Sequence, residues 1–131
     1  MLFWWVLYIF GSEVIYLPDE TITGYAPRDV SFRLIELDGV PIDTTTHLRF
    51  TGRKQMTLRT PCFAYRGRVK VPTPWFDYEP GATTEYACLN LPIETAIHDA
   101  LQDVSFVEIG GRFLLFSDDT GPRMVFRSDQ D

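Results

Sequence analysis

The sequence is poor in the residues that most often build metal and nucleophile sites. It has two cysteines and two histidines in 131 residues. There is no CxxC pair and no Cys/His cluster with the spacing of a zinc site, so we expect no metal and no cofactor. A glycine-rich phosphate loop, a dinucleotide fingerprint and a G-x-S-x-G turn are also missing. These absences argue against the common metal-, nucleotide- and serine-dependent enzymes.

Basic charge is scarce as well. Twelve Lys and Arg stand against eighteen Asp and Glu, a formal net charge of −6, which argues against nucleic acid as a partner. Half of the basic residues nevertheless fall between Arg53 and Lys70. Arg66, Arg68 and Lys70 alternate, so in a strand they share one face. A solvated outer face is the ordinary interpretation of such a pattern, and a basic docking patch is the alternative.

The one long hydrophobic run of the sequence is shorter than a membrane-spanning helix. Residues 2–10 read LFWWVLYIF, well below the roughly 20 apolar residues of a membrane-spanning helix. The run lacks the positive n-region and the A-x-A-like cleavage site of a signal peptide. Three interpretations stay open: a clipped or mis-started export signal, a membrane-surface anchor, or a core strand. Polar residues with Pro and Gly follow, so we expect an N-terminal segment with linker at 1–29 and a domain at 30–128.

The sequence of the domain predicts several short strands and one helix. Alternating patterns and turn residues predict strands at 31–37, 47–50, 55–60, 65–71, 104–109, 112–116 and 124–127, and extended pieces at 75–78 and 84–88 on either side of Pro80-Gly81. In the first strand Phe32, Leu34 and Glu36 share a face. Turns are expected at Gly110-Gly111 and over residues 118–121.

The helix is expected over residues 91–103. Its apolar stripe falls at i, i+3, i+4, i+7 and i+8, on Ile93, Ala96, Ile97, Ala100 and Leu101. Asn90 suits the N-cap, and Glu94 complements the helix dipole. The fold class is therefore α+β, a curved antiparallel sheet or partly open β-barrel with one helix packed on it. The connections between strands are too short for parallel crossovers.

The two cysteines allow three arrangements: one disulfide, two free buried thiols, or a lone nucleophile with a bystander. A thiol enzyme or redox sensor built on Cys62 needs a base, and only His47 and His98 are available, with no third group to complete a triad. A Cys62–Cys88 bond would join the middle of the sheet to the start of the helix and contribute roughly 3–4 kcal/mol. Such bonds persist in oxidising compartments.

Several segments, taken in order, resemble one family, the META domain or HslJ-like proteins. The matching segments are LIELDG at 34–39, HLRF at 47–50, PCFAYRG at 61–67, TEYAC at 84–88, and 107–126 with its Gly-Gly hairpin and MVF. The likeness covers about residues 30–127. Two positions depart from the family pattern: Phe63 stands where Asn is usual and Pro61 where Gly is common, so a role tied to that Asn is not carried over.

The resemblance implies a small α+β fold and a bacterial envelope protein, often a lipoprotein, associated with heat shock or stress and not established as an enzyme. No cysteine that could carry a lipid follows the apolar run directly, so lipid anchoring is not carried over. We expect a non-catalytic domain of the periplasm or cell envelope that binds or stabilises an envelope protein or contacts the membrane surface. The alternatives are a module for a small apolar ligand and a cytoplasmic location. The candidate ligand or partner surface comprises Tyr65, Arg66, Arg68, Lys70, Trp75 and Phe76.

Overall fold

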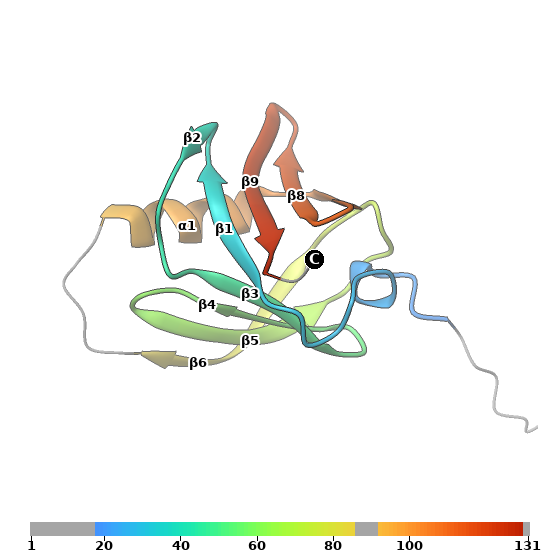
Figure 1. Cartoon of the computed structure of the whole chain (residues 1–131). Coiled ribbons are helices and arrows are strands. Elements are labelled where there is room, and N and C mark those ends of the chain that lie inside the picture. The colour runs from blue at the N-terminus through green and yellow to red at the C-terminus, as the bar shows by residue number, and fades with distance from the viewer. Residues whose placement is uncertain (1–17, 86–91, 130–131) are drawn as a thin grey trace, which may run out of the picture.

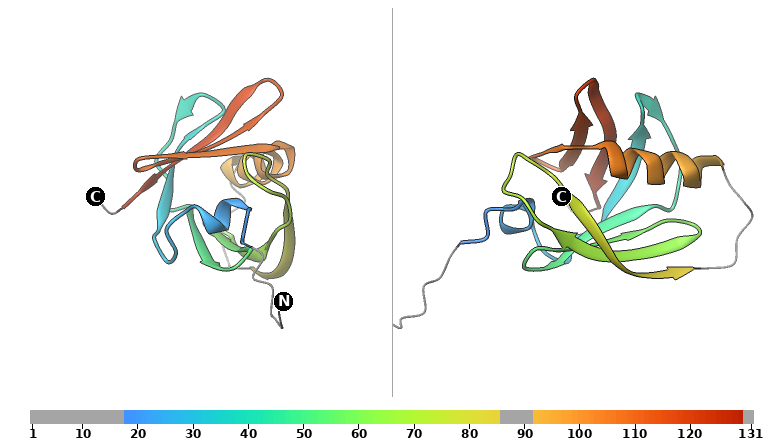
Figure 2. Two further views of the ribbon diagram at one scale, coloured as in Figure 1. Left: turned by 90° about the vertical axis from the view of Figure 1, so that its right-hand side faces the viewer. Right: turned by 180° about the vertical axis from the view of Figure 1, so that it is seen from behind.

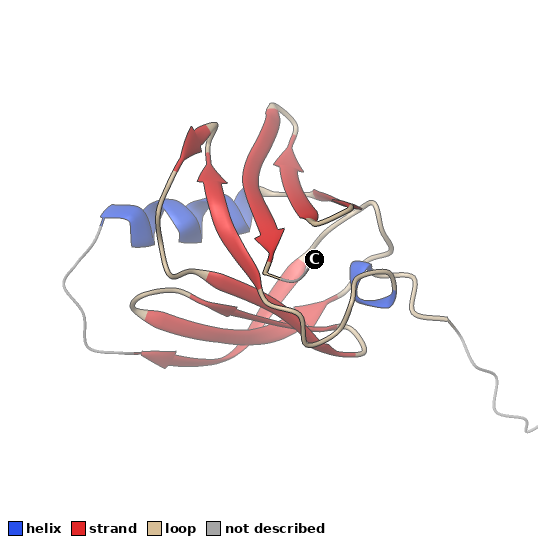
Figure 3. Ribbon diagram, viewed as in Figure 1, coloured by secondary structure: helices blue, strands red, loops and turns tan. Residues whose placement is uncertain are grey.

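A computed structural model describes residues 18–85 and 92–129 of the chain. Figure 1 shows a long helix beside a strongly curled sheet, and Figure 3 separates helices from strands by colour. The helical elements are η1 (Ile22–Gly24) and α1 (Pro92–Asp103). The strands are β1 (Phe32–Leu37), β2 (Val40–Pro41), β3 (His47–Gly52), β4 (Gln55–Arg59), β5 (Phe63–Val69), β6 (Tyr78–Glu85), β7 (Phe106–Gly110), β8 (Phe113–Asp118) and β9 (Gly121–Ser128).

All strand pairs are antiparallel, in the order β6-β5-β4-β3-β1-β9-β8-β7, with β2 paired to β1. The sheet bends at β1. This strand pairs with β3 only through Phe32 and Arg33, but with β9 along its whole length. The bend turns the sheet into a half-barrel, and α1 lies across its open side (Figure 2). The predicted α+β class with a curved sheet and one packed helix is confirmed.

The two edges of the sheet meet at one end. Trp75, just before β6, forms a bridge with Phe106 of β7. The backbone N–H of Phe76 donates to Ser105 over 2.8 Å, and that of Val107 donates to Pro74 over 2.8 Å. The edges are therefore joined by hydrogen bonds here, and α1 connects β6 to β7 further along the opening.

The core fills the inside of the half-barrel. Alternate residues of each strand point inward, and α1 adds Ile97, Ala100 and Leu101. The aromatic ring of Phe116 contacts those of Phe76 and Phe126, at centroid distances of 4.7 and 5.6 Å. Edge-to-face pairs of this kind add about 0.5–1.5 kcal/mol each beyond the burial of their area.

Two local predictions were wrong. A register shift between Leu34 and Glu36 interrupts the alternation of β1, so Leu37 is buried and Glu36 is not. Pro80-Gly81 does not divide two extended pieces, because β6 runs through both residues. Proline is tolerated there because β6 is an edge strand, where a missing N–H donor leaves no ladder bond unmade. Residues 86–88 of the predicted second piece lie outside the described part of the chain.

Residues 18–29, expected as a linker, pack on the domain. Ile22 is 1% exposed and belongs to the core. Asp19 accepts hydrogen bonds from the side chains of Thr21 and Thr23, and Thr23 Oγ1 accepts the backbone N–H of Lys54 over 2.8 Å. Burial alone would raise the pKa of Asp19, but these hydrogen bonds outweigh it and lower the pKa. The packed part of the structure therefore begins before Val30.

The apolar run near the N-terminus lies outside the described residues, so its three interpretations stay open. Within residues 18–85 and 92–129, no helix is long and apolar enough to span a membrane.

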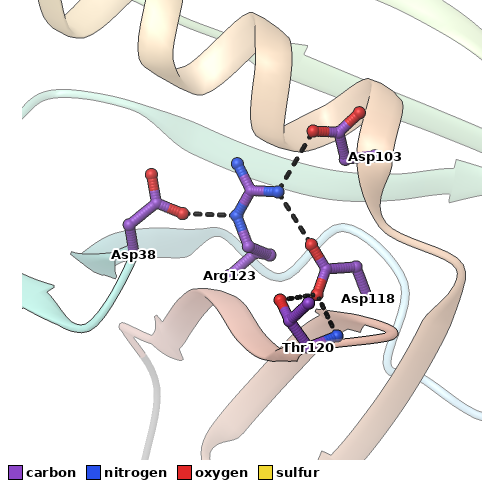
Figure 4. Close-up of polar contacts among 5 residues, drawn as sticks. All are labelled: Asp38, Asp103, Asp118, Thr120 and Arg123. Carbon is purple, nitrogen blue, oxygen red and sulfur yellow. Dashed lines mark hydrogen bonds and ion pairs between the residues drawn. The ribbon is translucent and has the colours of Figure 1, made fainter.

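An ionic cluster ties together the ends of four elements (Figure 4). Arg123 of β9 donates to Asp38 after β1, and its Nη1 donates to Asp103 at the end of α1 over 3.1 Å and to Asp118 of β8 over 2.8 Å. Asp118 also accepts the N–H and hydroxyl of Thr120, at 2.8 and 2.6 Å. The cluster fixes α1 and the β1–β2 turn to the β8–β9 hairpin.

Candidate functional site

An open groove runs between α1 and the edge formed by β5 and β6. It consists of two adjoining hollows of about 280 and 160 Å³ that share Tyr65 and His98. We call this feature the helix groove. The first hollow is lined by Phe63, Tyr65, Glu94, Thr95 and His98, and the second by Tyr65, Asp77, Tyr78, Pro80, His98, Leu101, Gln102 and Val104.

Glu94 is the most unusual residue of the helix groove. It lies in the first turn of α1, where the helix dipole favours a carboxylate. It is only 8% exposed. Its Oε1 accepts a hydrogen bond from the buried hydroxyl of Thr60, whereas its Oε2 is buried and has no partner among the described residues. An unpaired buried polar atom costs about 1–3 kcal/mol, and more when it is charged. No described residue offsets this cost at Oε2.

Aromatic rings form the wall beside Glu94. The ring of Tyr65 lies 5.6 Å from that of Phe63 and 6.1 Å from that of His98. Burial and the nearby Glu94 carboxylate raise the pKa of Tyr65. Tyr78 donates its hydroxyl to the Met56 carbonyl over 3.2 Å, and burial, with a smaller contribution from Tyr65, raises its pKa well above the ordinary value. Both phenols therefore stay protonated and uncharged near neutral pH.

This arrangement suits the binding of a cation or of an N–H donor. A carboxylate oxygen without a partner accepts such a donor, and electron-rich ring faces attract a positive charge placed over them. Within the described ranges, no three His, Cys, Asp or Glu side chains come together in a way that could hold a metal ion. An ammonium, a guanidinium and an amide N–H are donors with this chemistry.

The predicted surface residues of β5 divide between the two faces of that strand. Arg66 and Arg68 are exposed on the outer face, as expected for a solvated face, and Gly67 between them is buried. Lys70 is exposed just beyond the strand and forms loose ion pairs with Asp77 and Glu79, at 3.7 and 3.9 Å. Tyr65 lies on the inner side, in the helix groove. The set therefore does not form one site.

The other two predicted surface residues have separate roles. Trp75 is 54% exposed, and its ring packs at a tilt against that of Phe106, at a centroid distance of 4.9 Å, where the two sheet edges meet. Phe76 is 3% exposed and packs on Phe116, so it belongs to the core and is not available to a ligand.

Cys62 is buried, at 5% exposure. Reactive thiols are partly exposed and lie in electropositive surroundings, so this burial fits a structural role better than a catalytic one. Cys88 lies outside the described residues, so the Cys62–Cys88 bond stays a prediction.

Sequence reasoning did not identify the helix groove. Glu94 was assigned to the helix dipole alone, and His98 was considered only as a base for Cys62. A signal was available, because Glu94, Ile97 and Leu101 are spaced i, i+3 and i+7 on one helix face. That face is the buried one, as α1 buries Glu94, Ile97, Ala100 and Leu101. A charged residue within the buried stripe of a helix is therefore the sequence pattern that indicates a candidate site of this kind.

Comparisons with known proteins agree with this fold. The family model for the META domain matches residues 26–131. No curated protein matches the chain. Among solved structures, the NMR structure of the protein from Burkholderia xenovorans aligns with a TM-score of 0.56 and 16% identity, over 95% of this chain and 100% of that one. At that identity the likeness concerns the fold alone. The family match spans most of the sequence, and the chain therefore belongs to the META domain family.

Proposed function

We propose that this META domain is a non-catalytic domain of the bacterial cell envelope that binds or stabilises another envelope component, and that the helix groove is its binding site. The observation that carries the proposal is Glu94 Oε2, a buried carboxylate oxygen without a partner in the described chain. Polar groups left unpaired at a cost to stability are characteristic of sites kept for function.

The chemistry of the groove selects a positively charged group on the partner. Glu94 supplies an acceptor, and Phe63, Tyr65 and His98 supply ring faces and edges within the same hollow. Because Oε2 is covered, a donor reaches it through a small movement of the groove side chains, of which Thr95 and His98 are exposed. A Lys or Arg side chain of an envelope protein, or a small organic ammonium ion, has the required shape and charge.

One observation supports a binding role over a thiol enzyme: Cys62 is buried, whereas reactive thiols are partly exposed. The placement in the periplasm or envelope rests on the family resemblance and on the predicted disulfide.

The direct test is an NMR titration of the full chain with benzylammonium and with its neutral isostere, benzyl alcohol. We expect benzylammonium to shift the backbone signals of Thr60, Tyr65 and His98, and to bind about fivefold more tightly than the alcohol, equivalent to roughly 1 kcal/mol of charge and cation–π interaction. Absence of shifts at the groove with either compound would contradict the proposal.

The same titration distinguishes this proposal from the alternative function, the binding of a small apolar ligand. Equal affinity for the ammonium and the alcohol, at the same groove residues, would favour the small apolar ligand over a charged one. The side chains that would then matter are those of the second hollow, where Tyr78, Leu101 and Val104 present apolar surface.

A further inference from the structure

A separate hollow lies on the other side of the molecule from the helix groove and has the opposite charge. It measures about 220 Å³ and is formed around the paired ends of β1 and β9. Figure 2 shows this end of β9 on the side of the molecule away from α1. Its lining residues are Arg33, Ile35, Arg112, Arg127, Ser128 and Asp129. Three arginines against one acid give this lining a net positive charge in a protein whose formal charge is −6.

Strand register brings the arginines together. Arg33 and Arg127 are directly opposed in the β1–β9 pair, and both are exposed on the outer face. Directly opposed residues have Cβ atoms about 4.5–5.5 Å apart, and like charges in that position destabilise a sheet. Across the β1–β3 pair Arg33 faces His47, and His47 in turn faces Arg59 of β4. The row therefore runs across four neighbouring strands.

Arg33 is only weakly neutralised by the carboxylate of Asp43, which lies 3.9 Å away and whose side chain is fully exposed. Exposed pairs of this kind contribute about 0–1 kcal/mol. Arg112 is oriented toward the hollow by a hydrogen bond from its Nη2 to the Ser128 carbonyl, over 3.3 Å. A neighbouring backbone oxygen thus holds one guanidinium in place at the site.

We propose that Arg33, Arg112 and Arg127 form a binding site for a phosphate group. A guanidinium donates two parallel hydrogen bonds to an oxyanion, and three of them suit a tetrahedral group with several oxygens better than a planar carboxylate. The bound anion removes the repulsion between Arg33 and Arg127. The ligand is either a soluble phosphate compound or the phosphate of a lipid headgroup at a membrane surface.

The test compares two double variants with equal change in charge. Arg33→Gln with Arg127→Gln removes the site, whereas Arg66→Gln with Arg68→Gln removes two exposed arginines of the outer face that do not line the hollow. Each protein is titrated with inorganic phosphate, followed by the NMR signals of the arginine Nε–H groups. Each is also mixed with vesicles of phosphatidylcholine, with and without phosphatidylglycerol, and sedimented. Thermal unfolding checks that all variants fold.

We expect the site variant to bind at least about tenfold more weakly than the parent, because two charge-assisted contacts are lost, and the control variant to stay within about twofold. Phosphate binding by the parent without preference for phosphatidylglycerol identifies a soluble ligand. Sedimentation with phosphatidylglycerol vesicles and no response to phosphate identifies a headgroup. The proposal is overturned if the parent binds neither probe, or if the control variant loses as much affinity as the site variant.

Discussion

Arg123 and Asp118, on adjacent strands of one hairpin, are joined by a 2.8 Å hydrogen bond from Nη1 to Oδ2, and the same nitrogen reaches Asp103 at the end of α1. One guanidinium thus connects the last hairpin to the helix that lines the groove. Because the side chain of Arg123 is only 20% exposed, its ion pairs are shielded from water more than ordinary surface pairs are. The position of α1 depends partly on this contact.

Replacement of Arg123 by Gln is expected to lower the free energy of unfolding by about 1 kcal/mol, the upper range for surface ion pairs, because it leaves three aspartates close together without a counter-charge. Arg127→Gln on the same strand is the matched control and should not lower it. Urea denaturation of both variants provides the measurement. Equal stability of the two would mean that the cluster in Figure 4 contributes nothing.

Acid should weaken the same cluster. The hydrogen bond from the Thr120 side chain, followed by that from Arg123, lowers the pKa of Asp118 well below its ordinary value of 3.8. A group with a depressed folded pKa contributes stability that is present above its unfolded pKa and lost as pH falls toward the folded one. Stability should therefore decline below about pH 4.

In the variant Asp118→Asn, stability should decline less steeply below about pH 4 than in the parent. Asp119→Asn, at the exposed neighbouring position, should show the same pH dependence as the parent. Thermal unfolding between about pH 2 and 6 tests this. A decline in Asp118→Asn as steep as that of the parent would exclude Asp118 as the cause.

Gly67 is required by close packing between β5 and β6. A Cβ atom there would overlap the carbonyl oxygen of Glu79 and lie 2.8 Å from Cζ of Tyr78. Gly67→Ala should therefore cost about 1–3 kcal/mol, the usual range for overpacking. A Cβ at Gly110 meets no atom within 4 Å, so Gly110→Ala should change stability by no more than about 0.5 kcal/mol. Chemical denaturation distinguishes them, and similar values would contradict the packing argument.

The predicted Cys62–Cys88 bond can be tested by counting free thiols. Intact mass after alkylation should show no modified thiol before reduction and two afterwards, since the chain has two cysteines. Reduction should then lower stability by roughly 3–4 kcal/mol. Two thiols that alkylate without reductant would remove the main residue-based argument for an envelope location.

Most of the fold could be predicted from the sequence, because most of its strands, turns and its helix follow from local patterns of apolar and turn-forming residues. The period-2 patterns of β3 and β4 and the turn around Gly111 were predicted within a few residues, and the helix was predicted to end at Asp103, as observed. The predictions failed where contacts between distant segments determine the local structure. The register shift in β1 and the passage of β6 through Pro80 depend on which strands are neighbours, and local patterns do not encode this.

The two candidate sites were harder to predict from the sequence, because each combines residues from distant segments. Arg33 and Arg127 are 94 residues apart in the sequence, and only the β1–β9 pairing brings them together. The helix groove likewise joins Tyr65 of β5 to Glu94 and His98 of α1. Pairing across distant segments, together with the burial of Glu94, is information that appears only in the folded structure.

Glu94 is expected to be dispensable for folding. Gln at this position keeps the acceptor for Thr60 and replaces a charged buried oxygen by a neutral group, which is less costly to bury. The lost interaction with the helix dipole offsets part of this gain. The free energy of unfolding should stay within about 1 kcal/mol of the parent, as for Glu108→Gln at an exposed position of β7. A loss above about 3 kcal/mol, typical of a broken buried ion pair, would assign Glu94 a structural role instead.

The most direct test of the proposed function is the affinity of benzylammonium for the parent chain and for Glu94→Gln, measured by the same NMR titration. If the groove binds cationic groups through the free oxygen of Glu94, the variant should fold normally and bind about fivefold to tenfold more weakly. Affinity for benzyl alcohol should be unchanged. Equal benzylammonium affinity in the two proteins would contradict the assignment of Glu94 as the binding group, and with it the proposed use of the helix groove.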